Sequence, residues 1–261
     1  MRVLFSGDVA WSLGREVLAK SIPILKHEYG PFDFIVINCE NAAHGKGMTQ
    51  KIFDEFISLD VDAMTSGNHI WDKSAFFPVL DADIRIFRPA NYTHSCPGRG
   101  HGIVERKGKK LGILNLQGQV FMPPIDNPFL CADACLEELQ GLPVLVDFHA
   151  EATSEKLGLA NYLDGRVSAV IGTHTHVQTA DEKILPNGTA YITDAGMTGA
   201  HGGMLGVTYE SAMPKFLTGL PVKFEPCESL PAFNGVVIDI DETTCLASNI
   251  TRVNLAADSW I

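Results

Sequence analysis

The chain has 261 residues, 46% hydrophobic and 20% charged, a composition that suits one large α/β domain and excludes a disordered or coiled-coil protein. Its net charge of -11 comes from 20 basic and 31 acidic residues with no basic cluster, which excludes the footprint of a duplex nucleic-acid-binding protein. Phosphate chemistry stays open, because a bound metal ion can reverse the sign of the local field.

The amino terminus, MRVLFSGDVAW, lacks the basic region, apolar core and small-residue cleavage site of a signal peptide. No apolar run approaches the roughly 18 residues that a membrane-spanning helix needs. The six cysteines are scattered and include no C-x-x-C pair, which favours reduced thiols. We therefore expect a cytoplasmic protein that does not associate with a membrane.

Short apolar runs alternate with amphipathic stretches in the first part of the chain, the pattern of strands joined by helical crossovers. Strands are predicted at residues 3–6, 34–38 and 63–66. Helices are predicted at residues 14–29, 49–59 and 72–80, the second of them with Thr49 as its N-cap. An irregular loop rich in Pro and Gly follows from Arg88 to about Gly102.

The later part of the chain is richer in strands. A hairpin is predicted from strands at 102–106 and 111–116, and a helix at 154–163 between strands at 144–148 and 167–171. A strand at 190–193, a glycine-rich loop at 196–206 and a final hairpin of residues 235–240 and 245–253 complete the chain. No repeat or linker interrupts this order, so we expect residues 1–261 to form a single domain.

Both sets of strands are too apolar to face water, so each sheet must be covered on both faces. Two stacked mixed sheets with helices outside them meet that requirement. The sequence therefore predicts an α/β fold, a four-layer α-β-β-α sandwich. Ligands in such folds gather where the carboxyl ends of strands meet.

Polar residues follow five of the predicted strands: Asp8, Glu40-Asn41, Asn68-His69, His149, and the pair His174 and His176. Singly, each has an ordinary explanation. Asp8 could cap a helix or turn, His69 could lie on the surface, and His149 could be a core histidine bonded to the backbone. Coincidence at five strand ends is a poor explanation for the whole set. Carboxylates, amides and imidazoles together are the ligands of a two-metal hydrolytic site.

The chemistry of such a site explains these residue types. Two neighbouring cations need a bridging carboxylate to offset their repulsion, and neutral ligands keep the site positive for a phosphate. Imidazole with carboxylate suits two transition-metal ions, iron, manganese or zinc, better than calcium or magnesium. A water bridging the ions would become hydroxide near neutral pH and could attack phosphorus.

Longer motifs surround these residues. They are ENAAHGKG at 40–47, RPAN at 88–91, DFHAEATSEK at 147–156, HTHVQTAD at 174–181 and TDAGMTG at 193–199. In these motifs the chain resembles the calcineurin-like metallophosphoesterase superfamily and, more closely, the YmdB-type family of bacterial phosphodiesterases. The resemblance runs nearly end to end and weakens only after about residue 225.

The resemblance implies the metallophosphoesterase fold and a role for each site residue. One metal would be held by Asp8, Glu40, Asn41 and His176. The second would share Glu40 as a bridge and be completed by Asn68, His149 and His174. His69 would stay off the metals and act as general acid toward the leaving oxygen. Enzymes similar to this chain hydrolyse phosphodiesters, including 2′,3′-cyclic nucleotides.

Two positions depart from the family pattern. The superfamily usually has histidine where this chain has Ala10, and Asn41 is the candidate replacement. The family usually has glycine where this chain has Trp11. The indole could narrow the cleft or stack on a base, or it could be a packed loop residue. The choice of substrate depends on which interpretation holds.

We therefore predict a dinuclear metal-dependent phosphodiesterase whose partner is a small phosphodiester or nucleotide, with 2′,3′-cyclic nucleotides as the expected class. Two alternatives stay open: a phosphomonoesterase or nucleotidase, and a mainly regulatory metal-binding protein with incidental hydrolase activity. Arg88 and Lys156 could offer charge to a substrate phosphate or be salt-bridged at the surface. Monomer and homo-oligomer are both compatible with the sequence.

Overall fold

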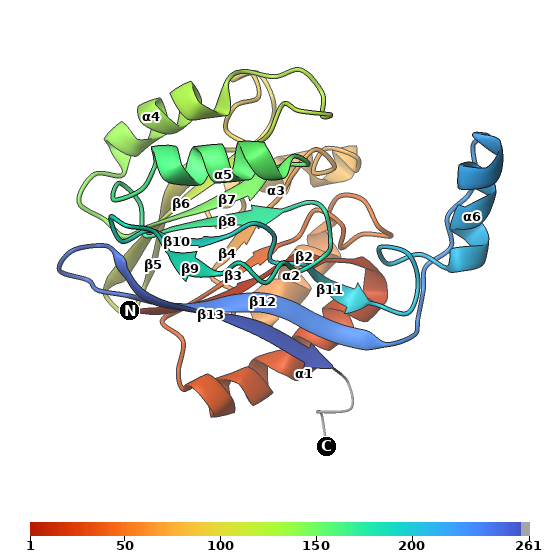
Figure 1. Ribbon diagram of the computed structural model, residues 1–261, viewed down its shortest axis with the longest axis horizontal. Helices are drawn as coiled ribbons and strands as arrows, with labels where there is room; N and C mark the ends of the chain where they lie inside the picture. Colours follow the sequence, from red (N-terminus) through yellow and green to blue (C-terminus); the bar gives the residue numbers. More distant parts are fainter. Residues whose placement is uncertain (257–261) are drawn as a thin grey trace.

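A computed structural model describes residues 1–256 and shows two β-sheets stacked face to face, with helices on the outer face of each (Figure 1). The predicted four-layer α-β-β-α fold is confirmed. Residues 257–261, the end of the predicted domain, lie outside the described part of the chain.

The first sheet has the strand order β2-β11-β12-β1-β3-β4, and β13 pairs with β12. Its strands are β1 (Arg2–Ser6), β2 (Asp8–Val9), β3 (Phe34–Asn38), β4 (Ala63–Thr65), β11 (Met197–Ala200), β12 (Pro231–Ile240) and β13 (Ala247–Ala256). Strands β1, β3 and β4 are parallel, so their carboxyl ends meet at one edge. Strand β12 runs antiparallel to β1 and β13, which makes the sheet mixed.

The second sheet has the order β5-β6-β7-β8-β10-β9. Its strands are β5 (His101–Arg106), β6 (Lys109–Gln117), β7 (Val144–His149), β8 (Ala169–Thr173), β9 (Lys183–Ile184) and β10 (Ala190–Ile192). Strands β6, β7, β8 and β10 are parallel to one another. The register pairs His149 with Thr173, so the chain leaves β8 at the level where β7 ends.

The helices form the outer layers. Those over the first sheet are α1 (Trp11–Tyr29), α2 (Gln50–Ser58), the 3-10 turn η1 (Ser74–Phe76) and α3 (Phe77–Ala82). Those over the second sheet are α4 (Pro128–Glu138) and α5 (Thr153–Tyr162). Helix α6 (Tyr209–Thr218) stands apart on an arm beside the sandwich (Figure 1).

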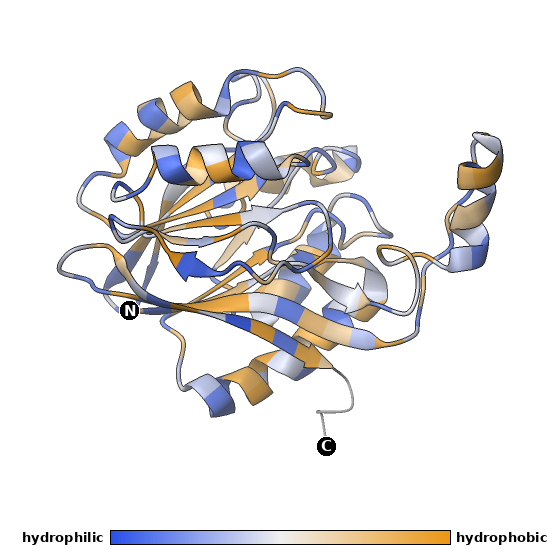
Figure 2. Ribbon diagram, viewed as in Figure 1, coloured by the Kyte–Doolittle hydropathy of each residue, from blue (hydrophilic) through white to orange (hydrophobic). Residues whose placement is uncertain are grey.

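Side-chain alternation along the strands produces the layered core. In β1, Val3 and Phe5 point into the layer between the sheets, whereas Leu4 points out toward α1. Figure 2 shows apolar residues along the strands of both sheets, whereas the helices mix apolar and hydrophilic residues. Because apolar side chains cover both faces of the central strands, polar side chains are concentrated at the strand ends.

The structure confirms most predicted elements and corrects some. Thr49 caps α2 as predicted, since its Oγ1 accepts from the backbone N–H of Ile52 at 3.3 Å. The predicted helix 72–80 is instead the turn η1 followed by α3, and the predicted loop 196–206 contains β11. Helices α4 and α6 were not predicted.

The structure bears on the predicted state of the cysteines and on the predicted lack of a membrane-spanning helix. All six cysteines are free thiols. Within residues 1–256, no helix combines the length and the apolar character needed to cross a membrane.

Candidate metal centre

Both sheets contribute side chains to one edge of the sandwich. The first sheet places Asp8, Glu40, Asn41, Asn68 and His69 just after the carboxyl ends of β1, β3 and β4. The second sheet places His149 at the end of β7 and His174 and His176 just after β8. Contacts between Asp8 and His174, Glu40 and His149, and Asn41 and His176 join the two sheets across the seam. Asn68 follows Gly67, where an added Cβ would lie 2.4 Å from Oε2 of Glu40.

Glu40, His149 and His174 form the centre of this group. One ligand atom from each lies within 4.8 Å of the others. Nε2 of His149 is 3.0 Å from Oε1 of Glu40 and 3.1 Å from Nδ1 of His174. Glu40 and His149 are buried, and His174 is partly exposed toward solvent. A carboxylate and two imidazoles at this spacing can share a metal ion.

The charges of these groups depend on one another in the metal-free protein. Burial opposes the charge on Glu40, but His149 and His69 outweigh it and lower the pKa of Glu40 to about 2. Burial also opposes the charge on His149, but Glu40 and Asp8 raise its pKa to about 9. Burial and the neighbouring His149 lower the pKa of His174 to about 3. A metal ligand must be unprotonated, so metal binding here would release a proton from His149.

Asp8, Asn41 and His176 lie beside this centre. Asp8 is fully buried, its Oδ2 accepts from the backbone N–H of His174 at 3.1 Å, and burial raises its pKa well above the usual value. Asn41 donates its Nδ2 to the carbonyl of Gly45 at 2.9 Å. Its Oδ1 is thereby turned toward His176, whose Nε2 is 3.3 Å away.

Three buried polar atoms among the described residues have no hydrogen-bond partner although they belong to predicted ligands. They are Oδ1 of Asp8, Oδ1 of Asn68 and Nδ1 of His176. A buried polar atom without a partner costs about 1–3 kcal/mol, so such atoms are rare unless a ligand satisfies them. Orphaned carboxylate, amide and imidazole atoms beside the Glu40 group fit a centre for metal ions.

His69 lies at the border of the centre. Its backbone N–H donates to Oε2 of Glu40 at 3.1 Å, and its Nδ1 is 3.2 Å from Oδ2 of Asp72. The side chain is a quarter exposed, and the Glu40, His149 and His174 ligand group does not include it. His69 therefore stands where it can reach a bound molecule.

The loop that carries His174 and His176 has an unusual backbone. Both residues have positive φ, 98° and 65°, a region that costs a non-glycine residue about 1–3 kcal/mol. Thr175 between them is held by Asp194, which accepts from its backbone N–H at 3.1 Å and from its Oγ1 at 2.6 Å. Asp194 in turn pairs with the buried Lys156 at 2.7 Å.

Asp147 has a similar supporting role that the sequence reasoning missed. Its buried carboxylate accepts from Nδ2 of Asn38 at 2.9 Å and from Oγ1 of Thr173 at 2.7 Å. Oγ1 of Thr173 also lies 3.0 Å from Nδ1 of His149, which fixes the orientation of that ring. Asp147 and Asp194 both lie in the family-like motifs, which was the signal available in the sequence.

A cavity of about 360 Å³ opens over the site. One side is lined by Glu40, Asn41, His69, His174 and His176, and the other by apolar residues of the segment that carries α6. Trp11 is not part of its lining. The indole packs instead on Gly45, where an added Cβ would lie 2.5 Å from Cζ2 of Trp11. Trp11 is thus a packing residue at the start of α1.

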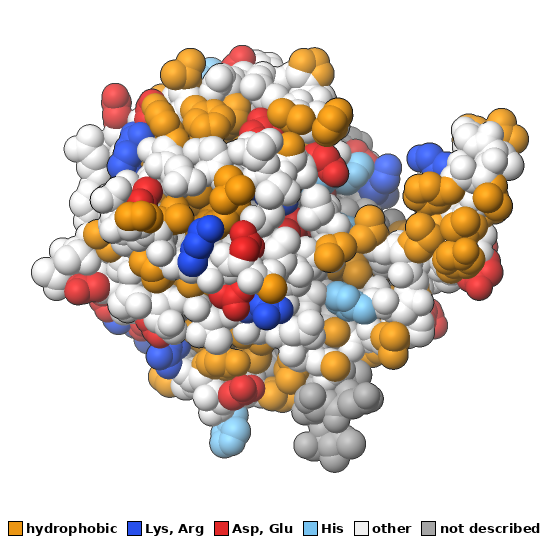
Figure 3. Space-filling view, in the orientation of Figure 1, with side chains coloured by type: hydrophobic (Ala, Val, Ile, Leu, Met, Phe, Trp, Pro, Cys, Tyr) orange, Lys and Arg blue, Asp and Glu red, His pale blue; other side chains and the backbone are white. Residues whose placement is uncertain are grey.

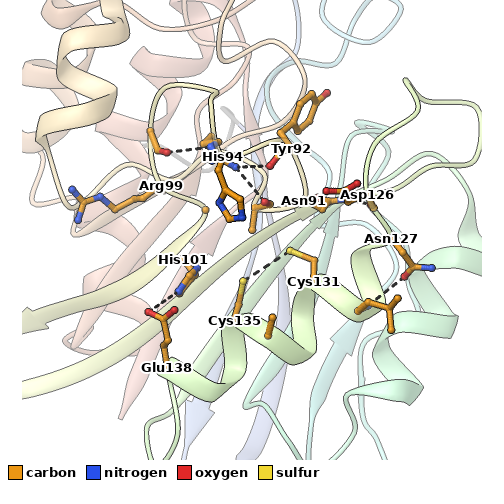
Figure 4. Close-up of a pocket in the computed structure, with 16 residues that line it drawn as sticks. Asn91, Tyr92, His94, Arg99, His101, Asp126, Asn127, Cys131, Cys135 and Glu138 are labelled. Atoms are coloured by element: carbon orange, nitrogen blue, oxygen red, sulfur yellow. Dashed lines mark hydrogen bonds and ion pairs between the residues drawn. The ribbon is translucent and has the colours of Figure 1, made fainter.

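A larger cavity, of about 680 Å³, lies between the loop 88–101 and α4 (Figure 4). Arg88 lines it, yet its guanidinium donates to the carbonyls of Pro89 at 2.8 Å and Gly98 at 3.1 Å. Arg88 therefore organises this loop, and Lys156 is paired inside the protein. Neither residue is placed to bind a substrate phosphate, and neither is a solvated surface charge.

The chain matches known proteins over nearly its whole length. A model of the YmdB-like protein family matches residues 4–253. The chain is 51% identical to a 2′,3′-cyclic-nucleotide 2′-phosphodiesterase of Bacillus subtilis (strain 168), over 99% of this chain and 98% of the relative. A hypothetical protein from Thermus thermophilus has a TM-score of 0.92 at 38% identity, covering 98% of this chain and 99% of its own. A Mycoplasma pneumoniae phosphatase has a TM-score of 0.92 at 32% identity, covering 98% and 93%.

Proposed function

This chain belongs to the YmdB-like family, and we propose that it hydrolyses the cyclic phosphodiester of 2′,3′-cyclic nucleotides. Membership and the relatives make it a phosphoric ester hydrolase. The convergence of Glu40, His149 and His174 within 4.8 Å, beside orphaned ligand atoms, is the observation that carries the proposal. The substrate class rests on the 51% identity to the Bacillus subtilis enzyme.

The residues divide between two metal positions in this proposal. Asp8, Glu40, Asn41 and His176 would hold one ion. Glu40 would also serve the second ion, together with Asn68, His149 and His174. Iron or manganese suits this mixture of imidazole and carboxylate, with zinc as the alternative. When bound, such ions neutralise the phosphate and lower the pKa of water.

The chain's own residues then orient the reaction. The loop held by Asp194 keeps both histidines in place before substrate arrives, so little reorganisation is needed on binding. Water adds to phosphorus and loses one proton to solvent, and the ester bond to one ribose oxygen breaks. His69 gives a proton to that leaving oxygen and takes one back from solvent. Asp72, whose Oδ2 lies 3.2 Å from Nδ1 of His69, orients the ring.

The proposal is tested by metal analysis together with a substrate profile. Purified protein is expected to carry two transition-metal ions per chain, to lose activity on 2′,3′-cyclic nucleotides after chelation, and to regain it with manganese. Linear dinucleotides serve as the matched comparison. Full activity in chelated, metal-free protein would refute the mechanism, and turnover of linear but not cyclic diesters would refute the substrate class.

A phosphomonoesterase is the second candidate, favoured by the Mycoplasma pneumoniae phosphatase at 32% identity. Rates on an aryl phosphate monoester and on the matching diester separate the two candidates. A faster monoester reaction would support the phosphatase. The six free thiols favour a reducing compartment, and we infer a cytoplasmic location.

A further inference from the structure

Helix α6 lies on an arm, residues 201–230, that projects from the sandwich (Figure 1). Within α6, which the structure describes in full, Ala212 alone is buried. Large apolar side chains are exposed along this arm, including Phe216 at 70%, Leu217 at 77% and Phe224 at 41%. Figure 3 shows apolar side chains gathered on the arm, including its side toward the sandwich. Apolar surface of this extent usually marks a binding site.

Part of this arm faces the metal centre. The cavity over the site is lined on the arm side by Met204, Leu205, Val207, Ala212, Phe216 and Phe224. Its other side holds Glu40, His69 and His174. One cavity thus combines a polar floor with an aromatic wall. Its volume of about 360 Å³ lies within the roughly 300–1,000 Å³ typical of small-molecule sites.

The aromatic wall is apolar and cannot bind a phosphate, whereas the polar floor can. A molecule whose ester lies on that floor must extend its remaining part toward the arm. In a nucleotide the planar part of that remainder is the base, and planar bases stack on aromatic rings. Lys215 does not line the cavity but adds a positive charge beside its wall, with its Nζ 5.6 Å from the centroid of the Phe224 ring. Such a charge complements an anionic nucleotide.

We propose that Phe216 and Phe224 form the nucleobase-binding wall of the active site, so that the arm selects phosphodiesters that carry a base. This inference rests on the proposed function, because it presumes that the phosphate lies on the metal centre. Neither phenylalanine touches the reacting atoms. They are specificity residues that act on binding, and the stacking is tolerant of base identity.

The test measures KM and kcat for Phe216→Ala and Phe224→Ala on two substrates, adenosine 2′,3′-cyclic phosphate and methyl ribofuranoside 2′,3′-cyclic phosphate, which has no base. Leu217→Ala is the matched control, since Leu217 lies on the same helix but does not line the cavity. Loss of one stacking ring should raise KM for the nucleotide roughly five- to fifty-fold. The KM for the substrate without a base and the kcat for both substrates should stay unchanged in the alanine variants. Phe216→Tyr should keep the wild-type KM for the nucleotide.

Other results would contradict the base-binding role of Phe216 and Phe224. Unchanged nucleotide KM in both alanine variants, or an equal loss on both substrates, would overturn the base-binding wall while leaving the hydrolase intact. Wild-type protein that turned over neither substrate would instead overturn the proposed function. If Leu217→Ala also lost activity and sedimentation velocity showed a smaller assembly, the arm would be an interface between copies of this chain.

Discussion

Replacing Lys156 with methionine is expected to destabilise the protein far more than the removal of an exposed salt bridge does. Lys156 and Asp194 are 1% and 0% exposed, and their charged atoms lie 2.7 Å apart. Methionine keeps most of the aliphatic stem but removes the cation. The carboxylate of Asp194 would then be buried without a counter-charge, which costs about 3–5 kcal/mol.

The remaining contacts of Asp194 place the expected loss within that range. Its carboxylate still accepts from the backbone and hydroxyl of Thr175 and from the backbone of Gly196, the last at 2.8 Å. These three donors offset part of the cost, so we expect a loss of about 3 kcal/mol in the free energy of unfolding. The double variant Lys156→Met with Asp194→Asn removes both charges and should recover about half of it.

Urea unfolding of metal-free protein, followed by circular dichroism, measures these changes without a contribution from bound ions. Lys26→Met is the control, because the Lys26–Asp60 pair is exposed and should contribute less than about 1 kcal/mol. A loss of free energy of unfolding in Lys156→Met no larger than in the Lys26→Met control would contradict this explanation, and so would a double variant no more stable than the single one. Either result would show that the unpaired buried charge does not cause the destabilisation.

Three further predictions concern the site itself. His69→Ala should retain its metal, measured by elemental analysis, and lose turnover mainly for substrates with poor leaving groups; loss of metal would instead make His69 a ligand. Gly67→Ala should abolish metal binding in a folded protein, because the new Cβ would lie 2.2 Å from the ring of His149, and normal metal content would contradict this contact. Asp147→Asn should weaken metal affinity about 10- to 100-fold in competition with a chelator, because the group that orients Thr173 and His149 is altered. An unchanged affinity would assign Asp147 to folding alone.

The strand ends were predictable because two local signals coincide there. The apolar run within 34–38 reads as a buried strand, and Glu40, two residues after its end, breaks the apolar pattern with a carboxylate. The same logic located Asp8, Asn68, His149 and the histidine pair. Their approach to one another depends on the stacking of two sheets, which the apolar character of both strand sets also predicted.

In the elements that the sequence did not predict, α4, α6 and β11, the local sequence signals do not agree with one another. Helix α4 has a good start, Asn127 as N-cap followed by Pro128, but its apolar residues show no clear face. Helix α6 contains Pro214 and exposes Phe216 and Leu217, so its pattern does not point to a core. Strand β11 contains Gly199 and exists because β2 and β12 pair with it. Tertiary contacts override weak local preference in that case.

The hydrogen bonds of Asp147 have a consequence for the relative position of the two sheets. Asn38 belongs to β3 of the first sheet, and Asp147 to β7 of the second, so their contact at 2.9 Å crosses the apolar layer at its rim. Apolar packing is not directional and would tolerate small sliding of one sheet over the other. A buried hydrogen bond is directional and stops that sliding at the edge where the ligands meet. The hydrogen bond between Asn38 and Asp147 thus fixes the position of one sheet relative to the other. It thereby holds the ligands from the first sheet in place against those from the second.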